Sequence, residues 1–205
     1  MNVYRRADVA FVRGEGMWVF DEKGERYLDF AAGIAVNALG HAHPHLVKAL
    51  CDQAHRIWHT SNLYRIPDQD RLAERLCANS FAERVFFTNS GVEAIECAIK
   101  TARAYFSSRN ENRYRIITLE GSFHGRSMAA ISASGQEKLT AGFAPLLPGF
   151  AQVAPEDLDA LEVAIDGETA AIMIEPVMGE GGVRPLSTED LRAWRALAGE
   201  RRLLL

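Results

Sequence analysis

The 205-residue chain has a formal net charge of −4, with 48% hydrophobic and 24% charged residues. This composition is typical of a globular protein and excludes a basic surface for nucleic acid or an anionic membrane. Cys51, Cys77 and Cys97 are too few and too scattered for a disulfide framework. No signal-type or membrane-spanning apolar run is present, so the sequence predicts a cytoplasmic protein.

The N-terminal segment is expected to begin with β structure. Residues 17–20 and 26–30 flank the turn DEKG, which predicts a hairpin. A glycine-containing loop follows, and Pro44 is placed to begin a helix because its fixed φ suits the first helical position. Another apolar stripe, at Arg71–Ala78, predicts a second helix. The apolar face of the first helix comprises Leu46, Val47, Leu50 and Ala54.

From residue 84 onward, short apolar runs alternate with helical patterns. The runs are RVFFT at 84–88, RIITLE at 115–120 and AAIMIEP at 170–176. Strands without polar alternation are buried on both faces, as in a parallel sheet. The sequence therefore predicts an α/β fold, with a mainly parallel sheet flanked by helices and preceded by a small α+β N-terminal segment. A glycine-bearing loop follows each run, where such sheets bind ligands.

The last predicted helix begins at a cap formed by Ser187 or Thr188 and buries Leu191, Trp194 and Leu197. The final residues, RRLLL, are typical of the start of another buried strand. Because chain ends normally lie outside a core, this ending predicts that the sequence is part of a longer chain.

The helix predicted after Thr88 begins with the features of an anion site. Ser90 and Glu93 fit a capping box, and Gly91 permits close approach of the backbone to a ligand. Free N–H groups at a helix start attract phosphate or carboxylate. A capping box alone more often only starts a helix, and neither GxGxxG nor GxxxxGK[ST] is present. The face expected to pack on the sheet comprises Ile95, Ala98, Ile99 and Ala102.

Two further loops carry groups suited to a planar, anionic ligand. In SFHGRS, Phe123 offers a ring for stacking and Arg126 offers a guanidinium for a carboxylate. EPVMGEGG supplies two acids, Glu175 and Glu180. Each loop alone is more simply a solvated surface loop, but three such loops at one sheet edge favour a single ligand site.

The alternating histidines of GHAHPH permit a zinc-site interpretation. His41, His43 and His45 have no carboxylate or cysteine at ligand spacing nearby. Pro44 is expected to start a helix between the last two, so that the three rings diverge. A structural loop that enters a helix is favoured, and no metal is predicted.

In this order, FFTNSGVEAIECAIKTAR, SFHGRS and IEPVMGEGG resemble the pyridoxal-phosphate aminotransferases of class III. YLDFAAGIAVNALGHAHPHLVKAL and WHTSNLYR resemble the acetylornithine aminotransferases of that family in particular. The resemblance implies the fold of the pyridoxal-phosphate-dependent transferases. Residues 1–55 would then be the N-terminal segment of the small domain, and 56–205 the first part of the cofactor-binding large domain, truncated at its C-terminus.

The resemblance implies pyridoxal 5′-phosphate as the cofactor. Ser90, Gly91 and Val92 match the turn that binds its phosphate through backbone N–H groups and the serine hydroxyl. Phe123 matches the residue that stacks on the pyridine ring, and His124 follows in the same pocket. Val92 departs from the family's usual alanine, which narrows the phosphate site.

Substrate contacts are likewise implied by the resemblance. Arg126 matches the arginine that binds the substrate α-carboxylate. Glu180 matches an acid that pairs with a mobile arginine further along the chain, and Glu175 matches an acid near the cofactor's edge. Three further departures from the family pattern are Ile95 for asparagine, Ser127 for threonine and Met178 for glutamine.

The implied activity is transfer of an amino group between N2-acetylornithine and 2-oxoglutarate in arginine biosynthesis, by a homodimer that binds neither nucleic acid nor membrane. Aminotransferases of succinylornithine, ornithine or 4-aminobutyrate are the alternative, because the same three loops serve all of them. A non-catalytic remnant is a further alternative. The family's Schiff-base lysine and pyridinium aspartate match no residue of this chain, so the chain alone is expected to be inactive. Its four lysines are Lys23, Lys48, Lys100 and Lys138.

Overall fold

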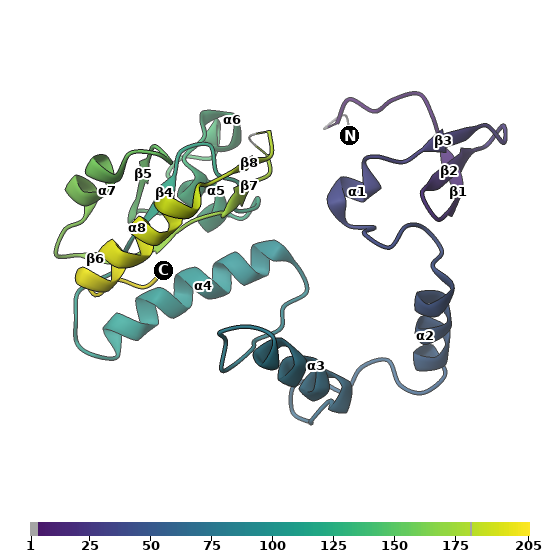
Figure 1. Cartoon of the computed structure of the whole chain (residues 1–205), viewed down its shortest axis with the longest axis horizontal. Helices are drawn as coiled ribbons and strands as arrows, with labels where there is room; N and C mark the ends of the chain where they lie inside the picture. The colour runs from purple at the N-terminus through teal and green to yellow at the C-terminus, as the bar shows by residue number, and fades with distance from the viewer. Residues whose placement is uncertain (1–3, 181) are drawn as a thin grey trace. The chain divides into compact units, whose positions relative to one another are not determined.

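The computed structural model describes residues 4–180 and 182–205. Contacts within the chain divide it into two compact units, of which the first ends at Arg84 and the second spans Val85–Leu205. Figure 1 labels the helices and strands of both units. The division predicted between residues 55 and 56 concerns the domains of the fold family and stays a prediction. The loop predicted after residue 176 includes Gly181, which lies outside the described residues.

The first unit contains a three-stranded antiparallel sheet in the order β1-β2-β3. The strands are β1 (Phe11–Glu15), β2 (Trp18–Asp21) and β3 (Arg26–Leu28). The predicted hairpin is confirmed, since β2 and β3 pair antiparallel with Trp18 opposite Leu28. The sequence pattern does not mark β1 as a separate strand, because glycine and charged residues interrupt its apolar alternation.

A single carboxylate organises the loop that follows β3. Asp29 Oδ1 accepts the N–H groups of Ala31 at 3.0 Å and Ala32 at 2.9 Å, and its Oδ2 lies 2.7 Å from His41 Nε2. The hydrogen bond with His41 and then that from Ala32 lower the pKa of Asp29. The backbones of His41 and Gly16 exchange two hydrogen bonds. The loop therefore closes onto the turn between β1 and β2.

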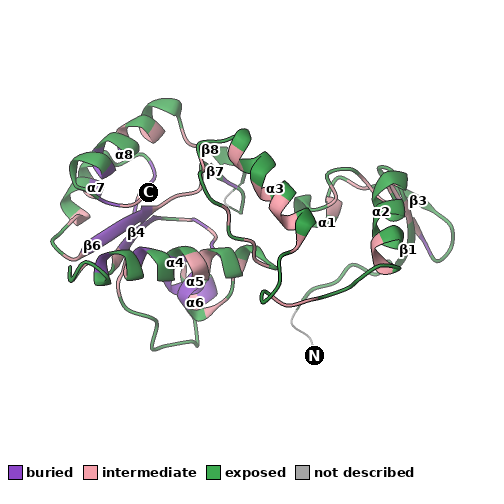
Figure 2. Cartoon of the chain, turned by 90° about the horizontal axis from the view of Figure 1, so that it is seen from below, coloured by how far each residue is buried: buried purple, intermediate pink, exposed green. Residues whose placement is uncertain are grey.

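The helices of the first unit are α1 (Ala32–Ala35), α2 (Pro44–Ala54) and α3 (Pro67–Ala78). Pro44 begins α2 as predicted, and α3 contains the predicted stripe but begins earlier, at a second proline. The apolar face of α2 is largely exposed, with Leu50 at 72%. Figure 2 shows most of α2 and α3 in the colour of exposed residues, so the stripes of these helices do not form a core within the described chain.

The second unit is built on a parallel sheet in the order β5-β4-β6, as the sequence predicts for an α/β fold. The strands are β4 (Arg115–Leu119), β5 (Phe150–Val153) and β6 (Thr169–Met173). Leu204 adds a parallel bridge to Ala171, donating its N–H to Ala170 O at 3.0 Å. The start of a strand expected in RRLLL is thus present beside β6.

The prediction of a strand at residues 84–88 is wrong. No ladder forms in this segment, and the Phe86 side chain is 76% exposed. A strand needs a neighbour for its N–H and C=O groups. In the described part of the sheet, which comprises β5, β4, β6 and Leu204, no strand pairs with residues 84–88. Apolar composition alone therefore did not predict this segment correctly.

Helices cover both faces of the parallel sheet, as Figure 1 shows for the second unit. Here α4 and α5 pack on one face, and α7 and α8 on the other. Figure 2 shows β4 and β6 in the colour of buried residues. No helix within the described residues is long and apolar enough to cross a membrane. The remaining elements are α4 (Gly91–Ser107), α5 (Met128–Ser134), α6 (Glu137–Thr140), α7 (Leu158–Ala164), β7 (Val177–Met178), β8 (Arg184–Pro185) and α8 (Thr188–Glu200).

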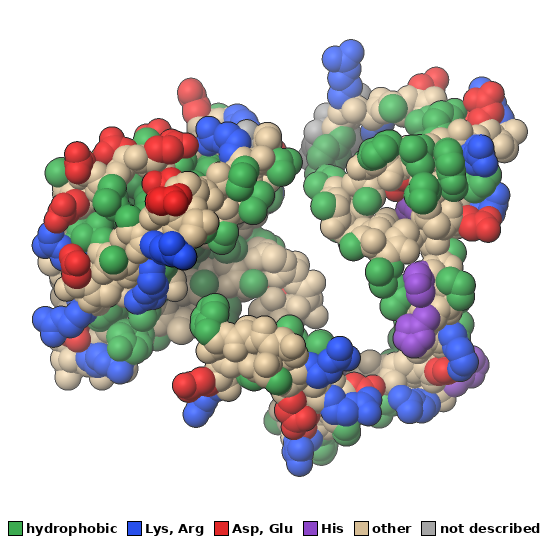
Figure 3. Space-filling model, viewed as in Figure 1, with side chains coloured by type: hydrophobic (Ala, Val, Ile, Leu, Met, Phe, Trp, Pro, Cys, Tyr) green, Lys and Arg blue, Asp and Glu red, His purple; other side chains and the backbone are tan. Residues whose placement is uncertain are grey.

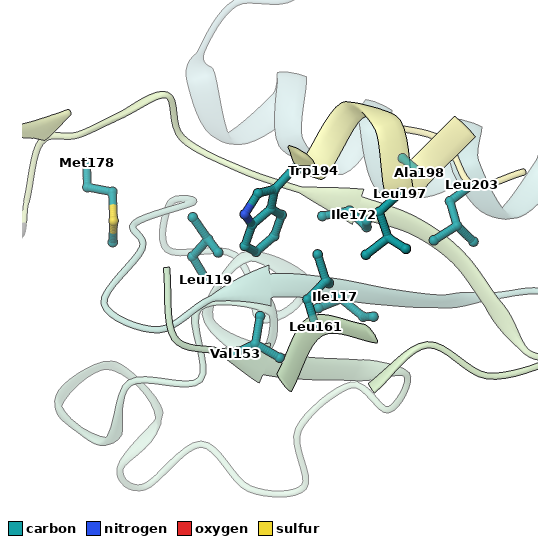
Figure 4. Close-up of a cluster of buried hydrophobic side chains, with 10 residues drawn as sticks. All are labelled: Ile117, Leu119, Val153, Leu161, Ile172, Met178, Trp194, Leu197, Ala198 and Leu203. Carbon is teal, nitrogen blue, oxygen red and sulfur yellow. The ribbon is translucent and has the colours of Figure 1, made fainter. Parts of the chain in front are cut away.

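The larger core cluster lies between the sheet and α8. Trp194 is 1% exposed and lies in one cluster with Ile117 and Ile172; Figure 4 shows it pointing from α8 toward the strands. Ser187 caps α8 by accepting the N–H of Asp190, which confirms the predicted helix start. This cluster packs on the face of the sheet opposite to α4.

The smaller cluster lies beneath α4. Ile99 and Ala102 are buried there with Ile116 of β4, as the predicted apolar face requires, and Ile95 is half-buried. Ala98 is exposed and lines an apolar cavity of about 430 Å³ between α4, β6 and Leu204. The prediction that Ala98 packs on the sheet is therefore wrong for the described chain.

Candidate functional site

The start of α4 offers unpaired N–H groups beside a variant of the capping box, in which Glu93 accepts the N–H of the residue before the cap. Ser90 Oγ accepts the Glu93 N–H at 3.3 Å, and Glu93 Oε2 accepts the Asn89 N–H at 2.6 Å. The first helical i→i−4 bond runs from Ala94 N to Ser90 O, so the N–H groups of Gly91 and Val92 precede it. A β carbon at Gly91 would meet nothing within 4 Å. This turn therefore has both donors and open space for an anion.

The loop after β4 lies on the first two turns of α4. Gly125 has φ +116°, and a β carbon there would lie 2.7 Å from Val92 Cγ2. Two residues further on, Ser127 Oγ donates a hydrogen bond of 2.5 Å to Glu96 Oε1. The structure thus brings together two of the three loops in which the sequence predicts site residues.

The loop after β6 joins the same site. Glu175 Oε1 accepts the Phe123 N–H at 2.5 Å, across 52 residues of sequence. A β carbon at Gly121 would lie 3.6 Å from Cε of the buried Met178. The predicted convergence of three glycine-bearing loops is therefore present. Glu175 acts here on the backbone of the residue whose ring is expected to face the cofactor.

His124 lies behind the loop and not on its surface. Its ring Nε2 is 2.9 Å from Ser122 Oγ, and its backbone N–H donates to Ser134 Oγ at 3.3 Å. Both side chains around it are buried, and burial lowers the pKa of His124 to about 4. The imidazole is accordingly neutral at neutral pH. Its contacts are those of a group that holds the loop in shape.

Arg126 and Phe123 present their side chains together. Arg126 is exposed, and its Cζ lies 5.4 Å from the ring centroid of the half-buried Phe123. Glu180 lies further along the β6 loop, where its Oε1 is 3.9 Å from Lys138 Nζ. An exposed pair at this distance contributes little to stability. The cation, the aromatic ring and the α4 turn thus form the centre of the candidate site, and Glu180 contacts Lys138 of α6.

Sequence reasoning missed two polar residues that shape this site. Ser122 is fully buried against His124, and Glu96 accepts the bond from Ser127. A signal for Glu96 exists in the sequence, because it lies four residues after Val92 and three before Ile99 and so neighbours both on the surface of α4. Ser122 gives no comparable signal.

The three histidines of GHAHPH do not come together. His41 bonds Asp29, His43 immediately precedes α2 with a buried Nδ1 that has no hydrogen-bond partner among the described residues, and His45 is exposed within α2. Across residues 4–180 and 182–205, no three His, Cys, Asp or Glu side chains are grouped as metal ligands.

Known proteins that this chain resembles are named as aminotransferases. A family model described as aminotransferase class-III matches residues 2–205. The whole chain is 57% identical to the acetylornithine aminotransferase of Agrobacterium fabrum and 46% identical to that of Aquifex aeolicus. These alignments cover 51% and 55% of the two relatives. The chain therefore spans about half the length of the curated relatives it matches.

Solved structures resemble the chain in the same way. The N-acetylornithine aminotransferase of Stenotrophomonas maltophilia has a TM-score of 0.81 at 40% identity, covering 99% of this chain and 51% of that one. The ornithine aminotransferase of Toxoplasma gondii has a TM-score of 0.90 at 31% identity, covering 97% and 48%. Because the family model matches nearly every residue, this chain belongs to the class-III aminotransferase family.

Proposed function

We propose that this protein uses pyridoxal 5′-phosphate to transfer an amino group between N2-acetylornithine and 2-oxoglutarate, a step of arginine biosynthesis. The observation that carries the proposal is the meeting of the α4 turn, Phe123 and Arg126 at one edge of the sheet. Relatives named acetylornithine aminotransferase are 57% and 59% identical over the whole chain. The identity favours this substrate, and the geometry supports a ligand that is both planar and anionic.

The residues of the α4 turn fit the cofactor's phosphate. Gly91 and Val92 would donate their N–H groups and Ser90 its hydroxyl, with the positive end of the helix dipole behind them. The open space beside Gly91 supports this fit. Phe123 would cover one face of the ring, since its backbone is held by Glu175. When bound, the cofactor supplies an electron sink for the carbon that carries the amino group.

The remaining site residues would bind and orient the substrate. Arg126 would hold a substrate carboxylate through two parallel N–H···O bonds, and its exposed guanidinium is accessible for this purpose. His124 stays neutral and holds the loop through Ser122. Glu180 is exposed and only loosely paired with Lys138, so it can exchange that partner for an arginine elsewhere in the protein. In this proposal these residues bind and orient the substrate.

Assembly and location complete the proposal. We propose a homodimer in the cytoplasm whose partners are amino-acid and 2-oxoacid substrates, with no nucleic-acid or membrane ligand. The net charge of −4 supports the absence of nucleic-acid and membrane ligands. Figure 3 shows acidic and basic side chains mixed on the face that it draws. A surface of mixed charge does not concentrate a field of one sign.

The test is steady-state kinetics of the natural protein, purified with its cofactor, using 2-oxoglutarate and four amino donors. N2-acetylornithine is expected to give the highest kcat/KM, followed by succinylornithine, ornithine and 4-aminobutyrate. Equal or better use of ornithine or 4-aminobutyrate would sink the acetylornithine assignment and favour the alternative within the family. No product from any donor would favour the non-catalytic alternative.

A further inference from the structure

We propose that Glu96 of α4 is a positioning residue, which holds Arg126 in place for the substrate carboxylate through its hydrogen bond with Ser127. The inference rests on the proposed function, in which Arg126 binds that carboxylate. Glu96 itself touches neither substrate nor cofactor in this proposal. Its effect passes through the backbone of the loop.

Arg126 lies between two residues that are fixed on α4. On one side, Gly125 lies so close to Val92 that a β carbon would be 2.7 Å from Cγ2. On the other side, Ser127 Oγ donates to Glu96 Oε1 at 2.5 Å. The main chain of Arg126 is thus held at both flanks, while its side chain remains exposed.

The direction of the Ser127 hydrogen bond follows from the second contact of the same hydroxyl. Ser127 Oγ accepts the Ala130 N–H at 3.3 Å, as the N-cap of α5. A hydroxyl has a single proton, and that proton is left for the Glu96 carboxylate. The serine therefore joins α4 to α5, and only the bond to Glu96 reaches α4.

The character of position 96 indicates a role beyond packing. Glu96 is half-buried on the side of α4 that meets the loop, one turn after Val92. Partial burial of a carboxylate costs free energy unless it is hydrogen-bonded. An apolar residue would fill this position without that cost, so an acceptor is what the position requires. A displaced Arg126 would bind the substrate carboxylate less tightly, because two parallel N–H···O bonds form only in a fixed geometry.

The test compares Glu96→Ala, which removes the acceptor, with Glu96→Gln, which keeps an acceptor oxygen. Glu200→Ala is the matched control, because it removes the same charge from an exposed position in the last turn of α8. The variants are made in the natural, cofactor-loaded protein. The probe is glutarate, a dicarboxylate without the oxo group that cannot accept an amino group. Its Kd is measured by calorimetry, beside KM for 2-oxoglutarate, kcat and the melting temperature.

Loss of a hydrogen bond to a charged group is expected to raise both the Kd of glutarate and the KM about 10-fold in Glu96→Ala, with a smaller change in kcat. Glu96→Gln should change them less than about 3-fold, and Glu200→Ala should leave them unchanged. A double-mutant cycle of Glu96→Ala with Ser127→Ala should show strong coupling in Kd, because either change breaks the same bond.

Two results separate this inference from the proposed function. If Arg126→Ala raises the Kd of glutarate but Glu96→Ala lowers only the melting temperature, the positioning role is overturned and the proposed function stands. Additive effects of Glu96→Ala and Ser127→Ala on Kd would also overturn the route through Ser127. If the natural protein fails to bind glutarate, or Arg126→Ala leaves its Kd unchanged, the assignment of Arg126 fails and this inference fails with it.

Discussion

Gly125 and Val92 are packed so closely that no side chain fits between them. A β carbon at position 125 would lie 2.7 Å from Val92 Cγ2 and 2.9 Å from its Cβ. The φ of Gly125 is +116°, a conformation that other residues rarely adopt. The loop that bears Phe123 and Arg126 therefore rests on α4 only because position 125 is glycine. Val92 is the residue of α4 that this loop meets at Gly125.

We expect Gly125→Ala to destabilise the protein by about 1–3 kcal/mol, from backbone strain together with the clash. Adding Val92→Ala should restore part of that loss, because it removes the Cγ atoms but not the strain. Denaturation midpoints in urea measure both effects. Gly199→Ala is the matched control within α8, where a β carbon meets nothing, and it should stabilise by up to about 1 kcal/mol. An equal loss with and without Val92→Ala would contradict the clash.

Glu175 is expected to control cofactor retention through the Phe123 backbone. Glu175→Ala leaves the Phe123 N–H without its acceptor, so the ring loses its fixed position, and the Kd of pyridoxal 5′-phosphate should rise about 10-fold. Glu175→Gln keeps an acceptor oxygen and should bind the cofactor nearly as well as the parent. Equilibrium dialysis measures the Kd. Equal weakening in both variants would mean that the charge of Glu175, and not its hydrogen bond, is what the cofactor requires.

His124 predicts a pH-dependent stability. Its pKa falls from 6.5 in the unfolded chain to about 4 in the folded protein, so the unfolded chain binds more protons between these values. The contribution of His124 to the free energy of unfolding should accordingly decrease as pH falls from about 6.5 to about 4, by at most about 3 kcal/mol, and change no further below that range. Urea midpoints followed by tryptophan fluorescence would show this slope. His124→Gln should flatten it, and identical slopes in parent and variant would refute the assignment.

Trp194 is expected to be the most costly core residue to truncate. It is 1% exposed and fills the space between α8 and the sheet. Trp194→Ala should lower the free energy of unfolding by about 3–5 kcal/mol, because it leaves a large cavity. Val163→Ala in α7, where the side chain is 86% exposed, should change it by less than about 0.5 kcal/mol. A small loss in Trp194→Ala would show that α8 does not pack as described.

A polypeptide of residues 1–205 is expected to form no specific covalent bond with the cofactor. Its four lysines are all exposed, whereas a lysine that forms a Schiff base readily is activated by desolvation or by a neighbouring cation. Borohydride reduction in the presence of pyridoxal 5′-phosphate should therefore label them weakly and without preference. Stoichiometric labelling at one site, located by peptide mapping, would contradict this. The four sites to compare are Lys23, Lys48, Lys100 and Lys138.

Features that depend on neighbours in sequence were predicted well. The helix starts at Ser90 and Ser187 follow from side chains that bond N–H groups three residues away. Pro44 at the start of α2 and the hairpin between β2 and β3 are equally local. The buried strands β4 and β6 could be predicted because apolar runs of their length pack on both faces of a sheet.

Features that depend on distant partners could not be predicted in the same way. The segment at 84–88 has the composition of a strand but lacks a neighbour, so its failure to pair is not visible in its own residues. The bond between Phe123 and Glu175 spans 52 residues, and that between Ser127 and Glu96 spans 31. The sequence placed the three loops at one edge of the sheet, but which side chain bonds which backbone is decided by packing.

The Asp29 carboxylate, which joins its own loop to His41, also bears on the order in which the chain folds. That contact closes only 12 residues, and β1, β2 and β3 pair with their immediate neighbours. Short closures cost little entropy and form early. Arg113, by contrast, bonds the carbonyl of Arg202 across 89 residues. During synthesis from the N-terminus, we therefore expect the hairpin and its loop to form before the ribosome has made the C-terminal residues that contact the parallel sheet.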